Sequence, residues 1–242
     1  MPNWELCIAF DHEVLANMNR GIDKYCFLLS AFIVCLATLC ACKGVPRDTE
    51  VFNSDFERGI PVNVVNGKIE QYNGTGVLGR YTDGGFEVKV TGMKAHDMIK
   101  ITFDLYIHDT WDGNTTGIDG RDVWIMNIDG WSDTYTTFAN GSCTNCTQSY
   151  PERQPTFVNN AFNFVQNKPN SNAIKTDLPG ACKLKDIKGG TSMYRIQRTF
   201  NHTESTLTLG CFGQIEDPDA ANKNCNESWS VDNMRITAIE LR

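Results

Sequence analysis

The eleven residues MIKITFDLYIH (98–108) decide the fold class, because apolar and polar side chains alternate along them. Five apolar side chains would share one face of a strand: Ile99, Ile101, Phe103, Leu105 and Ile107. The opposite face would carry Lys100, Thr102, Asp104 and Tyr106. A period of two over this length predicts a β-strand with one buried face.

Similar short strands follow from the pattern at 86–90, 123–128, 131–138, 194–200 and 206–212. Asp129-Gly130 between two of them predicts a hairpin turn. Only the stretch 156–166 suggests one or two helical turns. Many short strands separated by Gly and Asn turns predict a single all-β sandwich or barrel. Residues 139–192 are mostly irregular and would form a long insertion that carries three cysteines.

An apolar run of 17 residues (25–41) follows Arg20 and Lys24, which is typical of a secretory signal. We expect a signal peptide over 1–42, with Met18 as a possible true start, a short linker over 43–48 and one domain over 49–242. The mature chain would begin between residues 41 and 46. The alternatives are an uncleaved membrane anchor and a bacterial lipoprotein acylated at Cys42.

Six Asn-x-Ser/Thr sequons lie beyond this segment and predict N-glycosylation of a secreted or cell-surface protein. The same residue types also favour turns, so the pattern leaves open how many carry glycans. The six residues are Asn73, Asn114, Asn140, Asn145, Asn201 and Asn226.

Five cysteines lie beyond residue 42, and in an oxidising compartment they predict disulfides. Cys143 and Cys146 form a lone C-x-x-C, which is too little for a zinc site. We expect Cys211 to pair with Cys225 across one loop, and Cys182 to pair with Cys143 or Cys146. The fifth thiol would stay free or pair with Cys42.

Two terminal segments, FNSDFERG (52–59) and ESWSVDNMRI (227–236), resemble the matching ends of MAM domains and of jelly-roll carbohydrate-binding modules. The longer string FDLYIHDTWDGN (103–114) looks like a module of secreted and cell-surface proteins that closes with a Ser-Trp-x-x-Asp-Asn motif. The resemblance implies a jelly-roll β-sandwich, concanavalin A-like or galactose-binding-like. The early paired cysteines of MAM domains are missing, so their homotypic adhesion is not implied.

Acidic residues at both ends of the domain suggest a structural calcium ion as cofactor. If the first and last strands lie side by side, Asp55 or Glu57 would face Asp232 or Asn233, and one ion would hold both ends. Calcium takes six to eight oxygen ligands from such side chains. The alternative is that Asp232 and Asn233 only bond loop backbone.

A second candidate metal site lies in the loop HDTWDGNTTGIDGRD (108–122). Asp109, Asp112, Asn114 and Asp122 could ring a cation, although the spacing differs from that of an EF-hand. The alternative is a solvated polar loop whose carboxylates bond turn amides. A glycan on Asn114 would compete with its use as a ligand.

Aromatic side chains offer a possible sugar platform, because their faces pack against the C–H face of a pyranose. The candidates are Trp111, Tyr106 and Trp131, of which Trp111 stands out because its loop is polar. Trp124 lies in an apolar run and is expected in the core. Trp229 belongs to the closing motif and is expected to be structural.

Enzyme chemistry has little support, because no G-x-S-x-G elbow is present and histidines are few. The acidic balance of 29 Asp and Glu against 22 Lys and Arg argues against nucleic acid as a partner. We therefore predict a secreted or cell-surface recognition or adhesion module that binds carbohydrate, its partner being a glycan or a matrix glycoprotein. Membrane contact would come only through an uncleaved anchor or a lipid. The alternatives are a structural matrix protein acting through protein contacts, and a glycan hydrolase or lyase.

Overall fold

The computed structural model describes residues 45–115, 120–141, 143, 145–217, 219 and 221–241. The expected signal peptide (1–42) lies outside the described residues. Residues Pro46–Arg242 form one compact unit. In the described part of the chain, no helix is long and apolar enough to cross a membrane.

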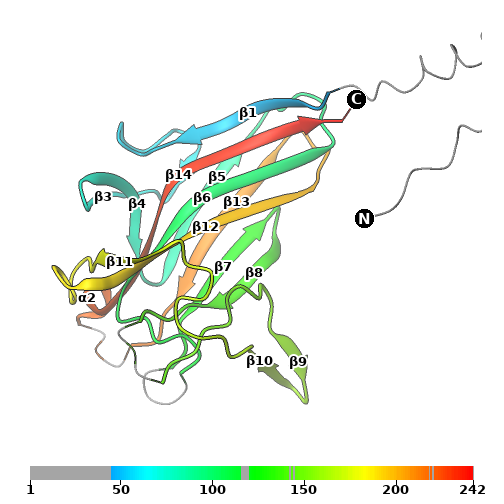
Figure 1. The fold of residues 1–242 in the computed structure, drawn as a ribbon. Coiled ribbons are helices and arrows are strands. Elements are labelled where there is room, and N and C mark those ends of the chain that lie inside the picture. Colours follow the sequence, from blue (N-terminus) through cyan, green and yellow to red (C-terminus); the bar gives the residue numbers. More distant parts are fainter. Residues whose placement is uncertain are drawn as a thin grey trace, which may run out of the picture. The chain divides into compact units, whose positions relative to one another are not determined.

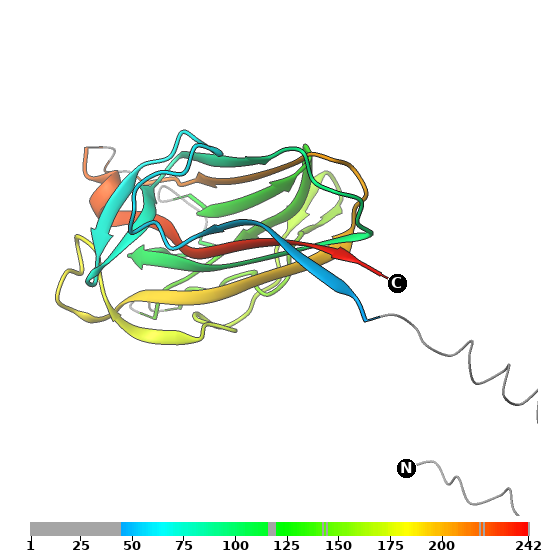
Figure 2. The same cartoon turned by 90° about the horizontal axis from the view of Figure 1, so that it is seen from above.

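Strands dominate this unit and form two main antiparallel sheets (Figures 1 and 2). The seven-stranded sheet has the order β11-β12-β6-β14-β4-β3, with β1 also paired to β14. Its strands are β1 (Arg47–Ser54), β3 (Ile69–Tyr72), β4 (Thr75–Tyr81), β6 (Met98–Asp109), β11 (Lys175–Pro179), β12 (Lys188–Asn201) and β14 (Glu227–Glu240).

The five-stranded sheet has the order β2-β5-β13-β7-β8. Its strands are β2 (Val64–Val65), β5 (Gly84–Val90), β7 (Val123–Ile128), β8 (Trp131–Thr137) and β13 (Leu207–Gln214). One short helix, α2 (Lys223–Asn226), precedes the last strand. The architecture is the predicted all-β sandwich of the jelly-roll class.

The core fills the space between the two sheets, as the alternation in 98–108 predicted. The inward side chains of β6 are fully buried, and they share one apolar cluster with Phe86 of β5 and Leu209 of β13. Burying a side chain of this size stabilises the fold by about 1.5–3 kcal/mol. Trp124 and Trp229 meet in this core with ring centroids 6.2 Å apart, as expected for both.

The last strand, β14, organises the larger sheet because it changes its neighbour on one side. Along one edge it pairs with β6 on both sides of an irregularity, through Glu227–Asp232 and Arg235–Ile239. Along the other edge it pairs with β4 through Trp229–Val231 and with β1 through Met234–Glu240. The register with β6 shifts between Asp232 and Arg235, and Asn233 there has a φ of 51°. A β-bulge of this kind bends a strand and re-aims its side chains. The expected pairing of the first and last strands is confirmed.

The stretch 156–166 is not helical, in contrast to the expectation. It holds a hairpin of β9 (Thr156–Val158) and β10 (Ala161–Asn163), which projects from the sandwich (Figure 1). Asn159 and Asn160 form its two-residue turn with φ values of 51° and 61°. Asn adopts positive φ readily, and a turn with two such residues matches the twist of a hairpin.

The disulfide pairing also differs from the prediction. Cys182 is bonded to Cys225, and Cys143 is bonded to Cys146. Cys211 is a free thiol with no exposed surface, because its position on β13 points into the core. Burial raises the pKa of this thiol far above its usual range. Cys211 therefore behaves as a small apolar core residue, and the predicted bond from Cys211 to Cys225 is wrong.

Candidate functional site

Acidic side chains gather where β1 ends beside the bulge of β14. Asp232 lies directly opposite Asp104 of β6, and Asp55 and Glu57 belong to the turn that follows β1. The side-chain amide of Asn233 donates to Asp104 Oδ2 at 3.0 Å, and the backbone N–H of Asn233 donates to Asp232 Oδ1 at 2.7 Å. We call these five residues the terminal cluster.

The terminal cluster carries excess negative charge. Asp232 is only 3% exposed, and burial is the main cause that raises the pKa of its carboxyl to about 6. The carboxylates of Asp104, Glu57 and Asp55 raise this pKa further. Arg195 pairs with Asp104 on one side of the cluster. Carboxylate and amide oxygens are the kind of ligand that calcium takes in proteins.

The geometry of the terminal cluster is looser than that of a finished metal site. Glu57 Oε1 accepts the hydroxyl of Thr75 and, at 2.8 Å, the N–H of Gly76. Among the described residues, no three Asp, Glu, His or Cys side chains stand in metal-ligand geometry. The sequence pattern identified four members of the cluster but missed Asp104, which looked like any polar residue on the outer face of a strand.

The four residues proposed to ring a cation in the loop 108–122 do not share one site. Asp109 is buried and accepts N–H groups of Cys182 at 3.1 Å and Leu184 at 2.9 Å, so it holds the 181–184 turn in place. Asn114 donates to the carbonyl of Val165 at 2.8 Å, and its Oδ1 accepts the hydroxyl of Thr137 at 2.6 Å. Both are therefore loop anchors, which corrects the prediction.

Asp112 and Asp122 do lie together, and a residue that the sequence did not single out joins them. The N–H of Asp112 donates to Asp122 Oδ2 at 3.2 Å. The side chain of Asp122 also bonds that of Glu227, the first residue of β14. Burial, and then the charges of Asp122 and Asp112, raise the pKa of Glu227 to about 10. In the sequence, the only signal that could have identified Glu227 was its position as the first residue of the closing motif (227–236).

The predicted aromatic platform does not form. Trp111 is fully buried, its indole N–H donates to the carbonyl of Ser228 at 2.9 Å, and its ring lies 6.4 Å from that of Phe138. Tyr106 is buried beside Tyr72, with ring centroids 5.5 Å apart. Trp131 alone is open to solvent, at 81% exposure in the β7–β8 hairpin. The polar loop folds back onto the sandwich, which is why Trp111 is a core residue.

His108 is also removed from solvent, although it precedes Asp109 in the sequence. Its ring nitrogens lie 3.0 Å from the hydroxyl of Thr191 and 2.7 Å from that of Ser230. Complete burial and the charge of Arg80 hold the pKa of His108 well below its usual value. The side chain is thus a neutral member of a buried hydrogen-bond network.

The sequons divide into two groups. Asn73, Asn145 and Asn201 are exposed. Asn114, Asn140 and Asn226 are buried, and in each the side-chain nitrogen donates a hydrogen bond within the fold. A glycan is attached through this nitrogen, so the folded domain has no room for one at the three buried positions. The exposed three remain predicted glycosylation sites.

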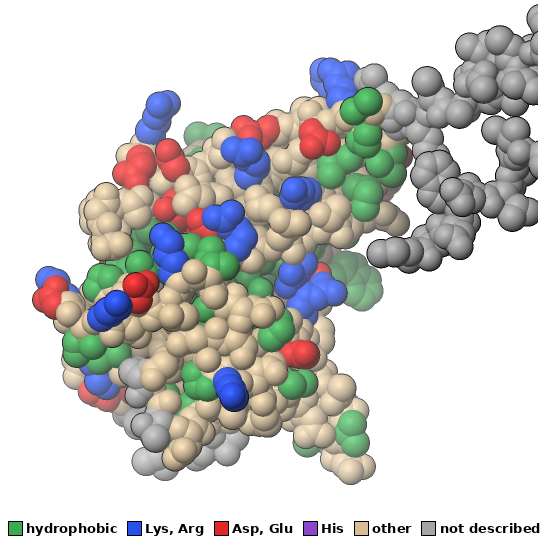
Figure 3. Space-filling view, in the orientation of Figure 1, with side chains coloured by type: hydrophobic (Ala, Val, Ile, Leu, Met, Phe, Trp, Pro, Cys, Tyr) green, Lys and Arg blue, Asp and Glu red, His purple; other side chains and the backbone are tan. Residues whose placement is uncertain are grey.

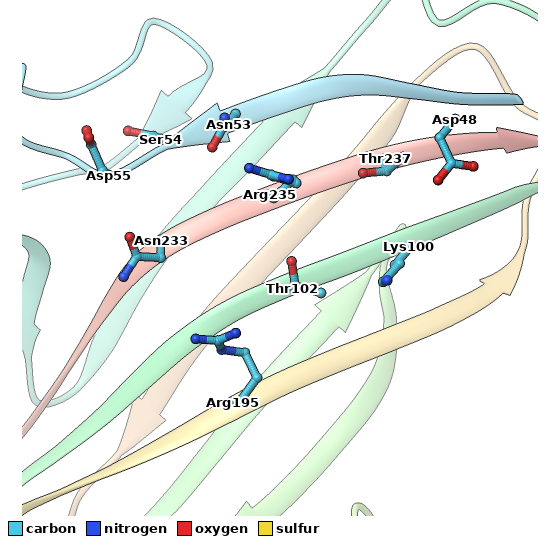
Figure 4. Close-up of a pocket in the computed structure, with 10 residues that line it drawn as sticks. All are labelled: Asp48, Asn53, Ser54, Asp55, Lys100, Thr102, Arg195, Asn233, Arg235 and Thr237. Atoms are coloured by element: carbon cyan, nitrogen blue, oxygen red, sulfur yellow. The ribbon is translucent and has the colours of Figure 1, made fainter. Parts of the chain in front are cut away.

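A polar groove crosses the outer face of the seven-stranded sheet and begins at the terminal cluster (Figure 4). Its volume is about 440 Å³, and none of its lining residues is apolar. On this face, basic and acidic side chains are interspersed (Figure 3). The lining residues are Asp48, Asn53, Ser54, Asp55, Lys100, Thr102, Arg195, Asn233, Arg235 and Thr237.

Comparison with known proteins finds matches among solved structures but not among families or curated sequences. No known family and no curated protein matches this sequence. Among solved structures, a family 35 carbohydrate-binding module from Clostridium thermocellum is 9% identical, with a TM-score of 0.32, over 80% of this chain and 98% of that chain. The CBM22-2 xylan-binding domain from Paenibacillus barcinonensis is 11% identical, with a TM-score of 0.33, over 78% and 99%.

A cleaved adhesin domain of Lys-gingipain from Porphyromonas gingivalis is 12% identical, with a TM-score of 0.34, over 78% of this chain and all of that chain. All three TM-scores lie below 0.5. The function proposed below therefore rests on the residues of this chain alone.

Proposed function

We propose that this domain is an extracellular recognition module that binds carbohydrate in the polar groove of its seven-stranded sheet. The observation that carries the proposal is the lining of the groove, which consists of ten polar or charged residues and no apolar one. A volume of about 440 Å³ falls within the usual range of ligand sites, roughly 300–1,000 Å³.

The chemistry of the lining favours a ligand rich in hydroxyl groups. Arg195, Arg235 and Lys100 are donors only, whereas Asp48 and Asp55 are acceptors only. The side-chain amides and hydroxyls of the lining both donate and accept hydrogen bonds, as the hydroxyl groups of a sugar do. Because side chains of both signs of charge line the groove, a ligand with charge of a single sign would meet repulsion at part of it. The ligand would be held by hydrogen bonds, since no aromatic side chain lines the groove.

Calcium belongs to this proposal as a structural ion of the terminal cluster. Asp55, Glu57, Asp104 and Asp232 would hold it, and its positive charge would offset the repulsion that raises the pKa of Asp232. Asp55 and Asn233 belong to both the cluster and the groove. Asp55 and Asn233 would fix the 55–59 turn against the bulge of β14. They would thereby set the shape of one end of the groove.

The extracellular address is part of the same proposal. It is supported by the signal-like run over 25–41, by the bond between Cys182 and Cys225, and by the three exposed sequons. Disulfides of this kind persist in oxidising compartments.

A glycan array probed with and without calcium tests the binding activity. Arg235→Ala should abolish binding to any glycan that the unsubstituted protein recognises. The matched control is Lys89→Ala on the five-stranded sheet, because Arg235 and Lys89 are both half-exposed and both pair with a glutamate at 3.1 Å. If both variants lost glycan binding equally, or if neither variant lost it, a site in the groove would be contradicted. Incubating each recognised glycan with the protein and analysing it for cleavage tests the enzymatic alternative.

A second function, adhesion through protein contacts, is favoured by the β9–β10 hairpin. Phe157, Val158 and Phe162 are each about half exposed or more on this projecting element. Clusters of exposed apolar residues often mark protein interfaces. Phe157→Ser with Phe162→Ser should abolish self-association in sedimentation experiments if the hairpin is adhesive, and should leave glycan binding unchanged.

A further inference from the structure

Three segments of the chain converge on a pair of buried carboxyl groups near α2. Asp122 lies just before β7, and Glu227 opens β14. Asp122 accepts N–H groups from Asp112, at 3.2 Å, and from Glu216, and its side chain bonds that of Glu227. The loop after β6, the segment after β13 and the start of β14 therefore all meet at this pair.

Two oxygens of this pair have no hydrogen-bond partner among the described residues. Asp122 is 1% exposed and Glu227 is 8% exposed, and Asp122 Oδ1 and Glu227 Oε2 are the atoms concerned. A buried polar atom without a partner is costly, and a buried charge more so. One proton shared between the two carboxyl groups would account for their mutual hydrogen bond. A bound cation would give both of these oxygens a partner.

We propose that Asp122 and Glu227 bind a divalent cation of the calcium type, which Asp112 and Asp217 help to coordinate. The ion would accept electron pairs from Asp122 Oδ1 and Glu227 Oε2, and carboxylate oxygens are the ligands that hard cations prefer. The site goes beyond the groove and the terminal cluster, and it does not depend on either.

The surroundings of the pair supply further oxygen donors and water. A cavity of about 550 Å³ opens beside it, and five acidic side chains line this cavity: Asp112, Glu216, Asp217, Asp219 and Glu227. Lys183 is the one basic residue of the lining. The excess of negative charge attracts a cation, and water in the cavity can fill the remaining coordination positions. Asp217 accepts the N–H of Asp219 and the side-chain amide of Asn226, each at 2.7 Å, so it would exchange one of these bonds for a bond to the ion.

This site is separate from the terminal cluster. Glu227 and Asp232 lie five residues apart on β14, which corresponds to about 17 Å along a strand. One ion cannot contact both. The proposed site would therefore hold an ion of its own, whether or not the terminal cluster binds one.

The cation would join the loop after β6 to the start of the last strand. The N–H of Thr110 already donates to the carbonyl of Asn226 at 2.8 Å, and the indole of Trp111 bonds Ser228. The bond between Cys182 and Cys225 ties a third segment to the same place. A bound ion would complete this junction.

Terbium(III) luminescence and equilibrium dialysis with calcium test the proposal on the full-length protein. Excitation of indole should sensitise terbium emission, because Trp111 and Trp229 are close neighbours in sequence of Asp112 and Glu227. Glu227→Gln, which preserves size and removes charge, should lower this emission at least tenfold and reduce the calcium bound by one ion per chain. Glu87→Gln, which removes the same charge from β5 of the five-stranded sheet, is the control, and it should leave the terbium emission and the calcium bound unchanged.

A second variant guards against a folding defect. Asp217→Asn changes a partly exposed residue and should weaken terbium binding several-fold while the circular dichroism spectrum stays that of the unsubstituted protein. If Glu227→Gln and Asp217→Asn both bind terbium and calcium as the unsubstituted protein does, or if that protein binds neither, the proposal is overturned. The pair would then be two carboxyl groups that share a proton.

Discussion

Asp232 of β14 lies directly opposite Asp104 of β6, and the charge of Asp104 helps to raise the pKa of Asp232 to about 6. Like charges that face each other across a strand pair are destabilising. The repulsion lies where β14 exchanges β4 for β1 as its neighbour. Arg195 and Asn233 offset part of it, and a proton or a cation at Asp232 would relieve the rest.

In a chelating buffer near neutral pH, Asp232→Asn should therefore stabilise the domain. The folded pKa of about 6 exceeds the ordinary value of 3.8, so the folded state binds the extra proton. Stability from this group is fully present below about pH 4 and is lost as the pH rises through about 6. The rise in the pKa of Asp232 corresponds to a loss of about 3 kcal/mol in the free energy of unfolding near neutral pH. Urea unfolding of both proteins from acid to neutral pH measures it, and a destabilised variant in chelator would contradict the account.

Calcium should largely offset this difference in stability. An ion that binds only the folded state stabilises it by about 2.7 kcal/mol at one hundred times its dissociation constant. The unsubstituted protein should gain this stability when calcium is added. The Asp232→Asn variant should lack the part of the gain that comes from an ion at the terminal cluster. Thermal melts in calcium and in chelator give the comparison, with Lys89→Ala as a control whose response should be normal. Identical melting curves of the unsubstituted protein under both conditions would show that no ion is bound.

The bond between Cys182 and Cys225 should contribute strongly to stability. It closes a segment of 43 residues, for which chain entropy gives about 4 kcal/mol. Cys225→Ser should lower the free energy of unfolding by this order. Peptide mapping without reduction should recover the Cys182–Cys225 pair, and Cys211 should react with thiol reagents only after unfolding. Recovery of a peptide that joins Cys211 to Cys225 would contradict the structure.

Trp111 should matter for stability and not for ligand binding. Trp111→Phe keeps most of the packing but leaves the carbonyl of Ser228 without its indole donor. The expected cost is about 1–3 kcal/mol in the free energy of unfolding. Glycan binding by the folded variant should equal that of the unsubstituted protein. Loss of glycan binding without loss of stability would restore Trp111 as a ligand-binding residue.

The sequence predicted the sandwich because its signal is local. Alternation along 98–108 specifies a strand with one buried face whatever the rest of the chain does. Asp129-Gly130 likewise specifies the turn between β7 and β8. The end motifs also located four of the five residues of the terminal cluster, since strand pairing at the ends of the domain brings them together.

Contacts that depend on how loops pack could not be predicted in this way. Trp111 lies in a polar stretch, yet its loop folds onto Ser228 and Phe138. Cys182 meets Cys225 because the buried carboxylate of Asp109 holds the 181–184 turn in place. No local sequence pattern predicts this role of Asp109. Glu227 joins Asp122 across more than a hundred residues, and the sequence analysis placed the two in separate motifs, the closing motif and the 108–122 loop.

The most direct test of the central claim is to map a bound glycan on the protein by NMR. Titration of the strongest glycan from the array into isotope-labelled protein in calcium should shift the backbone signals of Asn53, Thr102, Arg195, Asn233 and Arg235, which line the groove. Signals of Trp131 and of the β9–β10 hairpin should stay in place. Shifts that gather around Trp131 or the hairpin, with the groove unaffected, would contradict the account.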